Sequence, residues 1–361
     1  MLNFKIESTE GDARAGLLDI NGRKAKTPMF MPVATRGSVR TLLSKDLKEL
    51  GVEALICNMY HLLMRPGVEV IESSGGLHKF MNWDGIIFTD SGGFQMIRKG
   101  FSQNIKGNSV KFRSETDGNI IELTPGKNIE LQFRMDSDVA MCLDRCPPYP
   151  ADKESLISSV ETTTRWAKEC RGSEGIIFGI SQGGIDPSLR EKSCRDLADI
   201  GFQGYALGGL SIGEPAKDMY SMFDISNEIY PKGSPRYVMG LGSPLEMLEA
   251  IGRGMDVFDS AYPTRNARHG SVITSQGNLD IRKAKYKIDG NPLDPKCHCP
   301  TCQGYTRAYI HHLCRAEELS WMSLVTKHNL YFTLELMRGA REAILQDEFR
   351  EFKVKFEKNY G

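Results

Sequence analysis

The sequence lacks the features of membrane and secreted proteins. Its beginning, MLNFKIESTEGDARAG, has no basic segment followed by an apolar one, and nowhere do the roughly 18 successive apolar residues of a membrane helix occur. It also lacks an excess of either charge, because 46 basic side chains balance 46 acidic ones. We therefore expect a cytoplasmic protein with no membrane partner, in which any nucleic-acid site is a local basic patch.

A disulfide framework is also absent, since nine cysteines is an odd number and most of them stand alone in apolar segments. The exception is the segment CHCPTC, which holds Cys297, Cys299 and Cys302. Three thiols this close together typically bind zinc, and a tetrahedral structural site needs a fourth ligand. The candidates for that ligand, which spacing does not separate, are His298, His311, His312 and His328. We expect one structural zinc ion that stabilises a subdomain.

Short apolar runs alternate with amphipathic stretches along most of the chain. The eight runs, all too short for helices, are MFMPVA (29–34), ALICNMY (54–60), IIFTD (86–90), VAMCLD (139–144), IIFGIS (176–181), YALGGL (205–210), YVMGLG (237–242) and VFDS (257–260). The helices between them are expected to begin at Ser44, Thr124, Asp186 and Ser243. This alternation predicts an α/β fold, a (β/α)8 TIM barrel, with a doubly wound open sheet as the alternative.

Two segments interrupt the repeat. Residues 109–123 alternate apolar and polar side chains around Asp117-Gly118, which predicts a hairpin inserted after the third strand. Residues 271–330 contain the clustered cysteines and follow the eighth strand, so we expect a zinc-binding subdomain inserted there. No linker divides the chain, and residues 1–361 are therefore expected to form a single catalytic barrel domain.

Catalytic side chains of such barrels lie at the carboxyl ends of the strands. These positions hold Asn58, His61, Asp90, Asp144, Gln182, Gly208, Gly209 and Asp259. One such aspartate can simply cap a helix, but three facing one mouth favour a chemical role. Because neighbouring carboxylates cannot all ionise freely, one is expected to keep a proton and another to stay anionic. This division suits displacement at an anomeric carbon, with one carboxylate attacking and one carboxyl transferring protons.

Other residues near these strand ends suit a nucleobase and a polyanion. Paired glycines after several strands let the backbone approach a flat ligand, and Phe94 and Met239 can sandwich its ring, although such side chains more often belong to the core. Arg265 and Arg268 follow Asp259 in the most basic region of the chain. They can contact a phosphate backbone, whereas an ordinary solvated surface explains the nearby lysines equally well.

Several of these segments together resemble the tRNA-guanine transglycosylase (queuine tRNA-ribosyltransferase) family, of bacterial type. They are FTDSGGFQ (88–95), DRCPPYPA (144–151), FGISQGG (178–184), YALGGLSIGE (205–214), MGLGSP (239–244), FDSAYPTRNARHG (258–270) and CHCPTC. The resemblance runs nearly end to end. It implies a pentosyltransferase of queuosine biosynthesis that exchanges guanine 34, in the anticodon loop of tRNAs with GUN anticodons, for a 7-deazaguanine base.

The resemblance also implies roles for individual residues. Asp259 would form the covalent link to ribose in a double displacement, and Asp90 would be the general acid and base. The implied base-binding residues are Asn58, Ser91, Phe94, Asp144, Gln182, Gly209, Leu210 and Met239. Arg265 and Arg268 would contact the tRNA, and His328 is selected as the fourth zinc ligand. Bacterial members are generally homodimers, and the implied interface here includes Tyr305, Tyr309 and His312.

The identity of the incoming base depends on one position. Eukaryotic catalytic subunits, which accept the bulkier queuine, tend to have glycine where this chain has Ile212, so its branched side chain favours the smaller preQ1. The alternatives are a queuine-accepting salvage enzyme and a non-catalytic tRNA-binding partner subunit. Loss of the nucleophile would mark the partner subunit, whereas Asp90 and Asp259 are both present.

Overall fold

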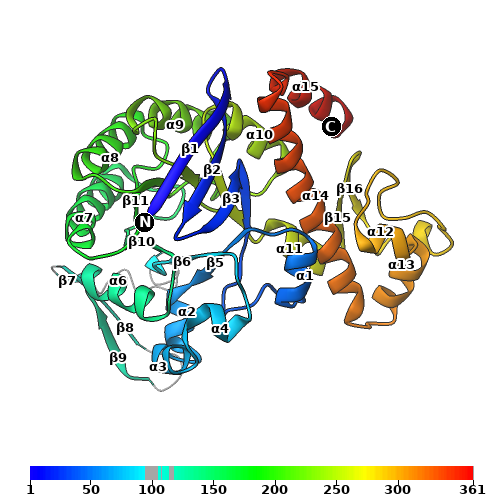
Figure 1. Cartoon of the computed structure of the whole chain (residues 1–361), viewed down its shortest axis with the longest axis horizontal. Coiled ribbons are helices and arrows are strands. Elements are labelled where there is room, and N and C mark those ends of the chain that lie inside the picture. The colour runs from blue at the N-terminus through cyan, green and yellow to red at the C-terminus, as the bar shows by residue number, and fades with distance from the viewer. Residues whose placement is uncertain (94–104, 107, 114–117, 361) are drawn as a thin grey trace.

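The protein is built around eight parallel strands that close into a barrel (Figure 1). The structure is a computed structural model that describes residues 1–93, 105–106, 108–113 and 118–360. The strands are β4 (Met29–Pro32), β5 (Ala54–Asn58), β6 (Ile86–Asp90), β10 (Val139–Met141), β11 (Ile177–Ser181), β12 (Gly204–Leu207), β13 (Arg236–Val238) and β14 (Val257–Ser260). Their order, β4-β14-β13-β12-β11-β10-β6-β5, closes because Val33 bridges to Ile56. The predicted TIM barrel is confirmed, with one strand in each of the eight runs.

Helices follow the strands and cover the outside of the barrel (Figure 1). They are α1 (Ser44–Glu49), α2 (Met59–Met64), α3 (Val68–Ser73), α4 (Gly76–Met81), α6 (Pro125–Arg134), α7 (Lys153–Arg171), α8 (Pro187–Ile200), α9 (Ala216–Ile229), α10 (Pro244–Gly252) and α11 (Tyr262–Arg268). Thr124 and Asp186 cap α6 and α8 through their side chains, as predicted. The predicted cap at Ser44 is wrong, because Ser44 already belongs to α1 and Asp46 accepts the Leu43 amide instead.

The insertion after β6 contains the predicted hairpin. Strand β8 (Ser109–Arg113) pairs antiparallel with β9 (Ile120–Leu123), and β7 (Ile105–Lys106) pairs with the other edge of β8. Asp117 lies outside the described residues.

An antiparallel sheet at the N-terminus has no counterpart in the sequence-based prediction. Strands β1 (Leu2–Glu10), β2 (Ala13–Ile20) and β3 (Arg23–Thr27) lie across one end of the barrel (Figure 1). The buried side chains of Leu18, Ile20 and Ala25 join the apolar cluster inside the barrel. This sheet closes the end of the barrel from which the strands start, so the opposite end is left for a ligand.

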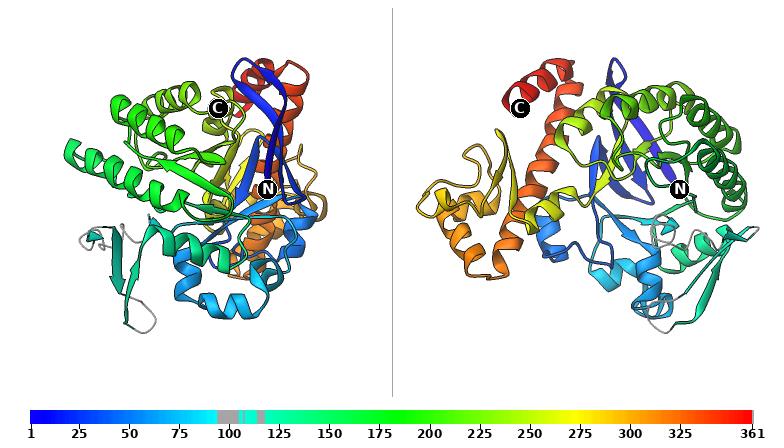
Figure 2. Two further views of the ribbon diagram at one scale, coloured as in Figure 1. Left: turned by 60° about the vertical axis from the view of Figure 1, so that its left-hand side comes forward. Right: turned by 180° about the vertical axis from the view of Figure 1, so that it is seen from behind.

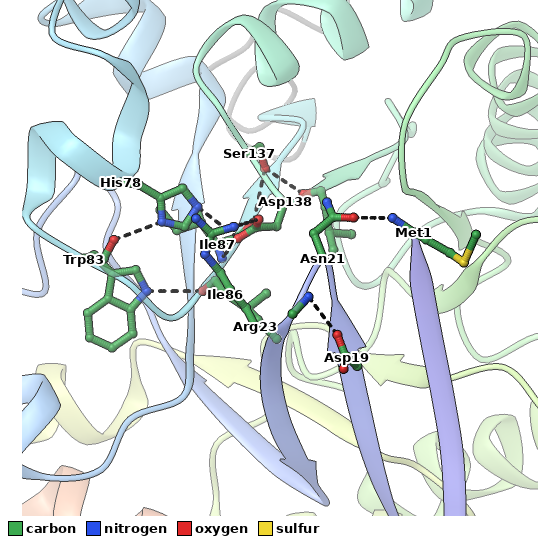
Figure 3. A network of polar contacts seen from close by, with 12 residues as sticks. Met1, Asp19, Asn21, Arg23, His78, Trp83, Ile86, Ile87, Ser137 and Asp138 are labelled. Carbon is green, nitrogen blue, oxygen red and sulfur yellow. Dashed lines mark hydrogen bonds and ion pairs between the residues drawn. The ribbon is translucent and has the colours of Figure 1, made fainter.

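A polar network fastens this sheet to the barrel (Figure 3). The Asp138 carboxylate, just before β10, accepts hydrogen bonds from the Ile87 amide at 2.8 Å and from Arg23 of β3 at 3.0 Å. Both ring nitrogens of buried His78 face acceptors, Asp138 Oδ2 at 3.0 Å and the Trp83 carbonyl at 2.9 Å. Burial alone would lower the pKa of His78, but the contacts with Asp138 and Trp83 outweigh it and raise that pKa. These contacts therefore favour the protonated imidazole, which donates from both nitrogens.

The C-terminal part of the chain lies beside the barrel (Figure 2). It comprises β15 (Ser271–Thr274), β16 (Gly277–Asp280), η2 (Ala284–Tyr286), α12 (Pro300–Gly304), α13 (Arg307–Arg315), α14 (Ser320–Leu345) and α15 (Phe349–Tyr360). Val272, Ile281, Ile310 and Trp321 belong to a small apolar core of its own. Helix α14 runs from this part back along the barrel and packs on α11 (Figure 1). No described helix combines the length and apolar character needed to cross a bilayer.

Candidate active site

Three aspartates lie at the open end of the barrel. Asp90 is the last residue of β6, Asp259 is the next-to-last residue of β14, and Asp144 follows β10. Asp144 is buried, whereas Asp90 and Asp259 are partly exposed at the mouth. The negative charges of Asp144 and Asp259 both raise the pKa of Asp90, as expected for carboxyl groups at neighbouring strand ends.

The environment of Asp90 favours its protonated form near neutral pH. Burial, followed by the negative charges of Asp144 and Asp259, raises the pKa of Asp90 to about 7. Asn58 lies opposite it on β5 and donates from Nδ2 to Asp90 Oδ2 at 2.9 Å. The other end of the Asn58 amide accepts the His61 amide at 3.1 Å as the cap of α2, so the orientation of Asn58 is fixed. Asp90 is thus a carboxyl group that can give and take a proton at neutral pH.

The environment of Asp259 differs, because both of its donors point at one oxygen and, among the described residues, no neighbouring carboxylate adds to the effect of burial on its pKa. The Tyr237 hydroxyl donates to Asp259 Oδ1 at 2.5 Å, and the Gly240 amide donates to the same oxygen at 2.9 Å. Burial raises the pKa of Asp259, but both of these hydrogen bonds favour the anion and oppose the rise. Sequence reasoning missed Tyr237, whose run YVMGLG looks like ordinary buried strand. Two donors on one oxygen thus hold the Asp259 carboxyl group in a fixed orientation at the mouth.

A second polar cluster, the Asp144 wall, comprises Asp144, Gln182 and Ser91. Gln182, fully buried after β11, donates from Nε2 to Asp144 Oδ2 at 2.6 Å, and the Ser91 hydroxyl lies 3.5 Å from Asp144 Oδ1. Gln182 Oε1 is buried and has no hydrogen-bond partner among the residues that the structure describes. Burial raises the pKa of Asp144 to about 6, although Gln182 and Ser91 oppose the rise. The Gln182 amide and the Ser91 hydroxyl thus hold the Asp144 carboxylate in one orientation beside Asp90.

Glycine is required beside Gln182. Gly209 has a φ of 68°, and a Cβ atom there would lie 2.5 Å from Gln182 Oε1. The backbone after β12 therefore lies directly against the side-chain amide of Gln182 in the Asp144 wall. Leu210 is buried and follows this turn, while Met239 is partly exposed at the end of β13. The predicted stacking residue Phe94 lies outside the described residues.

Arginines gather near the same mouth. Arg265 is exposed on α11, and Arg268, one turn later, is partly buried and donates from Nε to the Thr264 carbonyl at 3.0 Å. Burial and then the charges of Arg40 and Arg265 lower the pKa of Arg268. Arg40, on the loop after β4, was missed because it is far away in sequence. Within the described part of the chain, none of the three forms an ion pair, so this arginine cluster (Arg40, Arg265 and Arg268) can bind an anion.

The clustered cysteines meet one histidine. The ligand atoms of Cys297, Cys299, Cys302 and His328 all lie within 4.8 Å of one another. His328 Nε2 hydrogen-bonds to the Ile273 carbonyl at 2.8 Å, which directs Nδ1 to the sulfurs of Cys299 and Cys302 at 3.5 and 3.2 Å. A tetrahedral zinc ion with bonds of about 2.0 to 2.3 Å brings its ligands roughly this close together. The cluster therefore fits a zinc ion.

The other candidate ligands lie elsewhere. His311 Nδ1 is occupied by the Ile281 carbonyl at 2.8 Å, and neither His298 nor His312 belongs to the cluster. Chain spacing could not distinguish these histidines, because the selection depends on how α14 returns past the cysteines. The second contact of His328, to a backbone carbonyl, is the arrangement that commonly orients a metal-binding imidazole.

Comparison with known proteins agrees with this geometry. Residues 8–361 match the family model described as "Queuine tRNA-ribosyltransferase". Proteins with that name from Staphylococcus aureus strains bovine RF122 / ET3-1 and JH9 are each 46% identical over 357 residues, which is 98% of this chain and 94% of theirs. The chain therefore belongs to the queuine tRNA-ribosyltransferase family.

Proposed function

We propose that the protein is a tRNA-guanine transglycosylase that exchanges guanine 34 of GUN-anticodon tRNAs for a 7-deazaguanine base. The observation that carries this proposal is the asymmetry between two carboxyl groups of one site. Burial raises the pKa of both groups, but the negative charges of its neighbours raise that of Asp90 further, to about 7, whereas Tyr237 and Gly240 oppose the rise at Asp259. A proton-transferring carboxyl beside an oriented carboxylate is what displacement at an anomeric carbon requires.

In the first half of the reaction, the Asp259 carboxylate attacks C1′ of the ribose. The bond between C1′ and the guanine nitrogen breaks, the electron pair leaves with guanine, and the Asp90 proton neutralises the departing base. The product is an ester between Asp259 and the ribose, with inversion at C1′. The base must first leave the anticodon stack, which costs a few kcal/mol.

In the second half, the incoming base gives a proton to the Asp90 carboxylate, and its nitrogen attacks C1′ from the face that guanine left. The ester bond breaks and restores the Asp259 anion. Two inversions give net retention. The negative charge of Asp259 returns to the place where the Tyr237 hydroxyl and Gly240 amide already point, so little reorganisation is needed.

The Asp144 wall suits the edge of a guanine-like base. The Asp144 carboxylate, oriented by Gln182, would accept N–H groups of the base, while backbone groups at Gly209 and Leu210 lie beside Gln182. Asn58 and Ser91 orient the two aspartates, and Met239, with Phe94, would cover the faces of the ring. Ile212 is partly buried on the adjoining loop, where its branched side chain favours preQ1 over the bulkier queuine.

The arginine cluster at the mouth would hold the tRNA. Its charges have no acidic partner among the described residues and lie on α11, which follows Asp259, and on the loop after β4. Such charges suit the phosphates and bases of the anticodon loop around the target.

The zinc-binding group would contribute to structure, since four protein ligands leave no site for water. We propose the ion as part of a subdomain spanning residues 271–330. The same region presents the rings of Tyr305 and Tyr309, stacked at 5.5 Å and 41% and 46% exposed, with exposed His312 beside them. Aromatic side chains exposed in this way suit a homodimer interface. Mass photometry of Tyr309→Ala would then show monomers where the unmodified protein shows dimers.

The test of the enzymatic proposal is incorporation of labelled guanine into unmodified GUN-anticodon tRNA, followed by displacement of the label with preQ1 or queuine. We expect incorporation that preQ1 reverses more efficiently than queuine. Chase by queuine alone would favour the salvage enzyme. Binding of tRNA without any exchange, in folded and zinc-loaded protein, would instead identify a non-catalytic partner subunit.

A further inference from the structure

Arg190 of α8 is fully buried although no carboxylate pairs with it in the described part of the chain. The sequence around it, PSLREKSCRD, looks like the polar face of a surface helix. Burying a guanidinium group is costly unless hydrogen bonds replace its water. The position of those hydrogen bonds therefore indicates what Arg190 does.

The acceptors of Arg190 lie at the end of β11 and in the two turns on either side of the Gln182 side chain. Nη1 donates to the carbonyl and the hydroxyl of Ser181 at 2.9 and 3.1 Å. Nη2 donates to the carbonyls of Gly184 and Gly208 at 3.0 and 2.9 Å. One planar group thus connects the end of β11, the turn after it and the turn after β12.

The residue enclosed by these contacts is Gln182. It lies between Ser181 and Gly184, and the turn at Gly208 lies against its side chain, where a Cβ atom would be 2.5 Å from Nε2. Its own amide donates to the Ser193 hydroxyl of α8 at 3.0 Å, and its side chain binds Asp144. A shift of either loop would move the Gln182 side chain and, through it, the Asp144 carboxylate.

We propose that Arg190 is a positioning residue that sets the affinity of the pocket for the incoming base by fixing both loops around Gln182. The inference rests on the proposed function, because it assigns the Asp144 and Gln182 wall to the base. Arg190 does not touch the base itself. Its fork of donors spans four acceptors at fixed angles, which a single ammonium group cannot reproduce.

The experiment compares Arg190→Lys with Arg236→Lys. Arg236 is equally buried and also has an unpartnered Nε, but it lies at the other end of the barrel, where it donates to the carbonyls of Tyr230 and Gly254. We measure KM for preQ1, KM for tRNA and kcat. Arg190→Lys should raise the KM for preQ1 roughly tenfold to a hundredfold, as expected for lost charged hydrogen bonds, with the KM for tRNA unchanged. Arg236→Lys should leave the KM for preQ1 and the KM for tRNA unchanged.

Two further measurements keep the outcome decisive. Ser181→Ala removes one of the four acceptors of Arg190, together with the hydrogen bond from that hydroxyl to the Ala206 carbonyl, and should raise the KM for preQ1 by a smaller factor, even if Arg190→Lys folds poorly. Hydrogen exchange of the segments around Gln182 and Gly208 should speed up in Arg190→Lys and not in Arg236→Lys, whether or not the protein exchanges bases. An unchanged KM for preQ1 in an active Arg190→Lys enzyme would overturn the inference alone, whereas absence of exchange in the unmodified protein would overturn the proposed function.

Discussion

Replacing Tyr237 with phenylalanine removes a single hydrogen bond from the proposed nucleophile. The hydroxyl lies 2.5 Å from Asp259 Oδ1, and after the substitution the Gly240 amide at 2.9 Å is the remaining donor to that oxygen in the described part of the chain. A hydrogen bond to a charged group contributes about 1.5 to 3 kcal/mol. Its loss destabilises the Asp259 anion relative to the protonated form, because the Tyr237 hydroxyl no longer opposes the rise in pKa that burial causes.

The consequence is a change in the pH dependence of kcat/KM. On the acid side of the profile, where the anion is the minor form, Tyr237→Phe should be roughly tenfold to a hundredfold slower than the unmodified protein. The acid limb therefore moves to higher pH. At alkaline pH the two enzymes should converge in kcat/KM for tRNA, which depends only on the attack by Asp259, since an anion that has lost a hydrogen bond is no weaker as a nucleophile.

The assay is guanine exchange measured across pH, with Tyr205→Phe as the matched control. Tyr205 is also buried, on the neighbouring strand β12, but its hydroxyl accepts the Phe202 amide outside the site. The control should keep the unmodified pH profile. An equal loss at every pH in Tyr237→Phe would refute the reasoning, because it would indicate damage to the fold in place of a change in the charge of Asp259.

Three other predictions concern separate parts of the molecule. Cys299→Ser should abolish zinc binding, which contributes about 10 to 16 kcal/mol in small zinc domains. Hydrogen exchange should then become faster in residues 271–330 before it becomes faster in the barrel. Equal protection from exchange without metal would contradict a structural ion. Because the pKa of His78 is raised in the folded protein, its contact with Asp138 stabilises the protein below about pH 6.5, and this stability is lost as the pH rises through the folded pKa. The free energy of unfolding in urea should fall over this pH range, and His78→Gln should remove the dependence. Ile212→Gly should raise kcat/KM for queuine by about tenfold or more and leave kcat/KM for preQ1 nearly unchanged. Equal effects on kcat/KM for the two bases would argue against a steric limit at this position.

The barrel and the acidic residues of the site were accessible from sequence for a simple reason. Parallel strands buried on both faces need continuous apolar runs, and the residues that end such strands face one mouth, so Asp90 and Asp259 could be named from the pattern alone. The N-terminal sheet was missed because it belongs to no strand-helix repeat, and its role as a cover is visible only once Leu18 is seen inside the barrel.

The supporting residues could not be predicted, because their roles depend on long-range packing. Tyr237 reads as a strand residue until its hydroxyl is found beside Asp259. Arg190 reads as a surface residue until the loops close over it. Arg40 joins the arginine cluster only because β4 and β14 are neighbours in the closed sheet. Chemistry at strand ends is thus local information, whereas the groups that tune it come from elsewhere in the chain.

The most direct test of the account is to trap the bond between Asp259 and the ribose. The protein is mixed with GUN-anticodon tRNA without free base, quenched in acid, digested and mapped by mass spectrometry. We predict a ribose adduct on the peptide that contains Asp259, which disappears when preQ1 is added and is absent in Asp259→Asn. Efficient base exchange with no adduct, or with an adduct on another residue, would contradict the assignment of Asp259 as nucleophile.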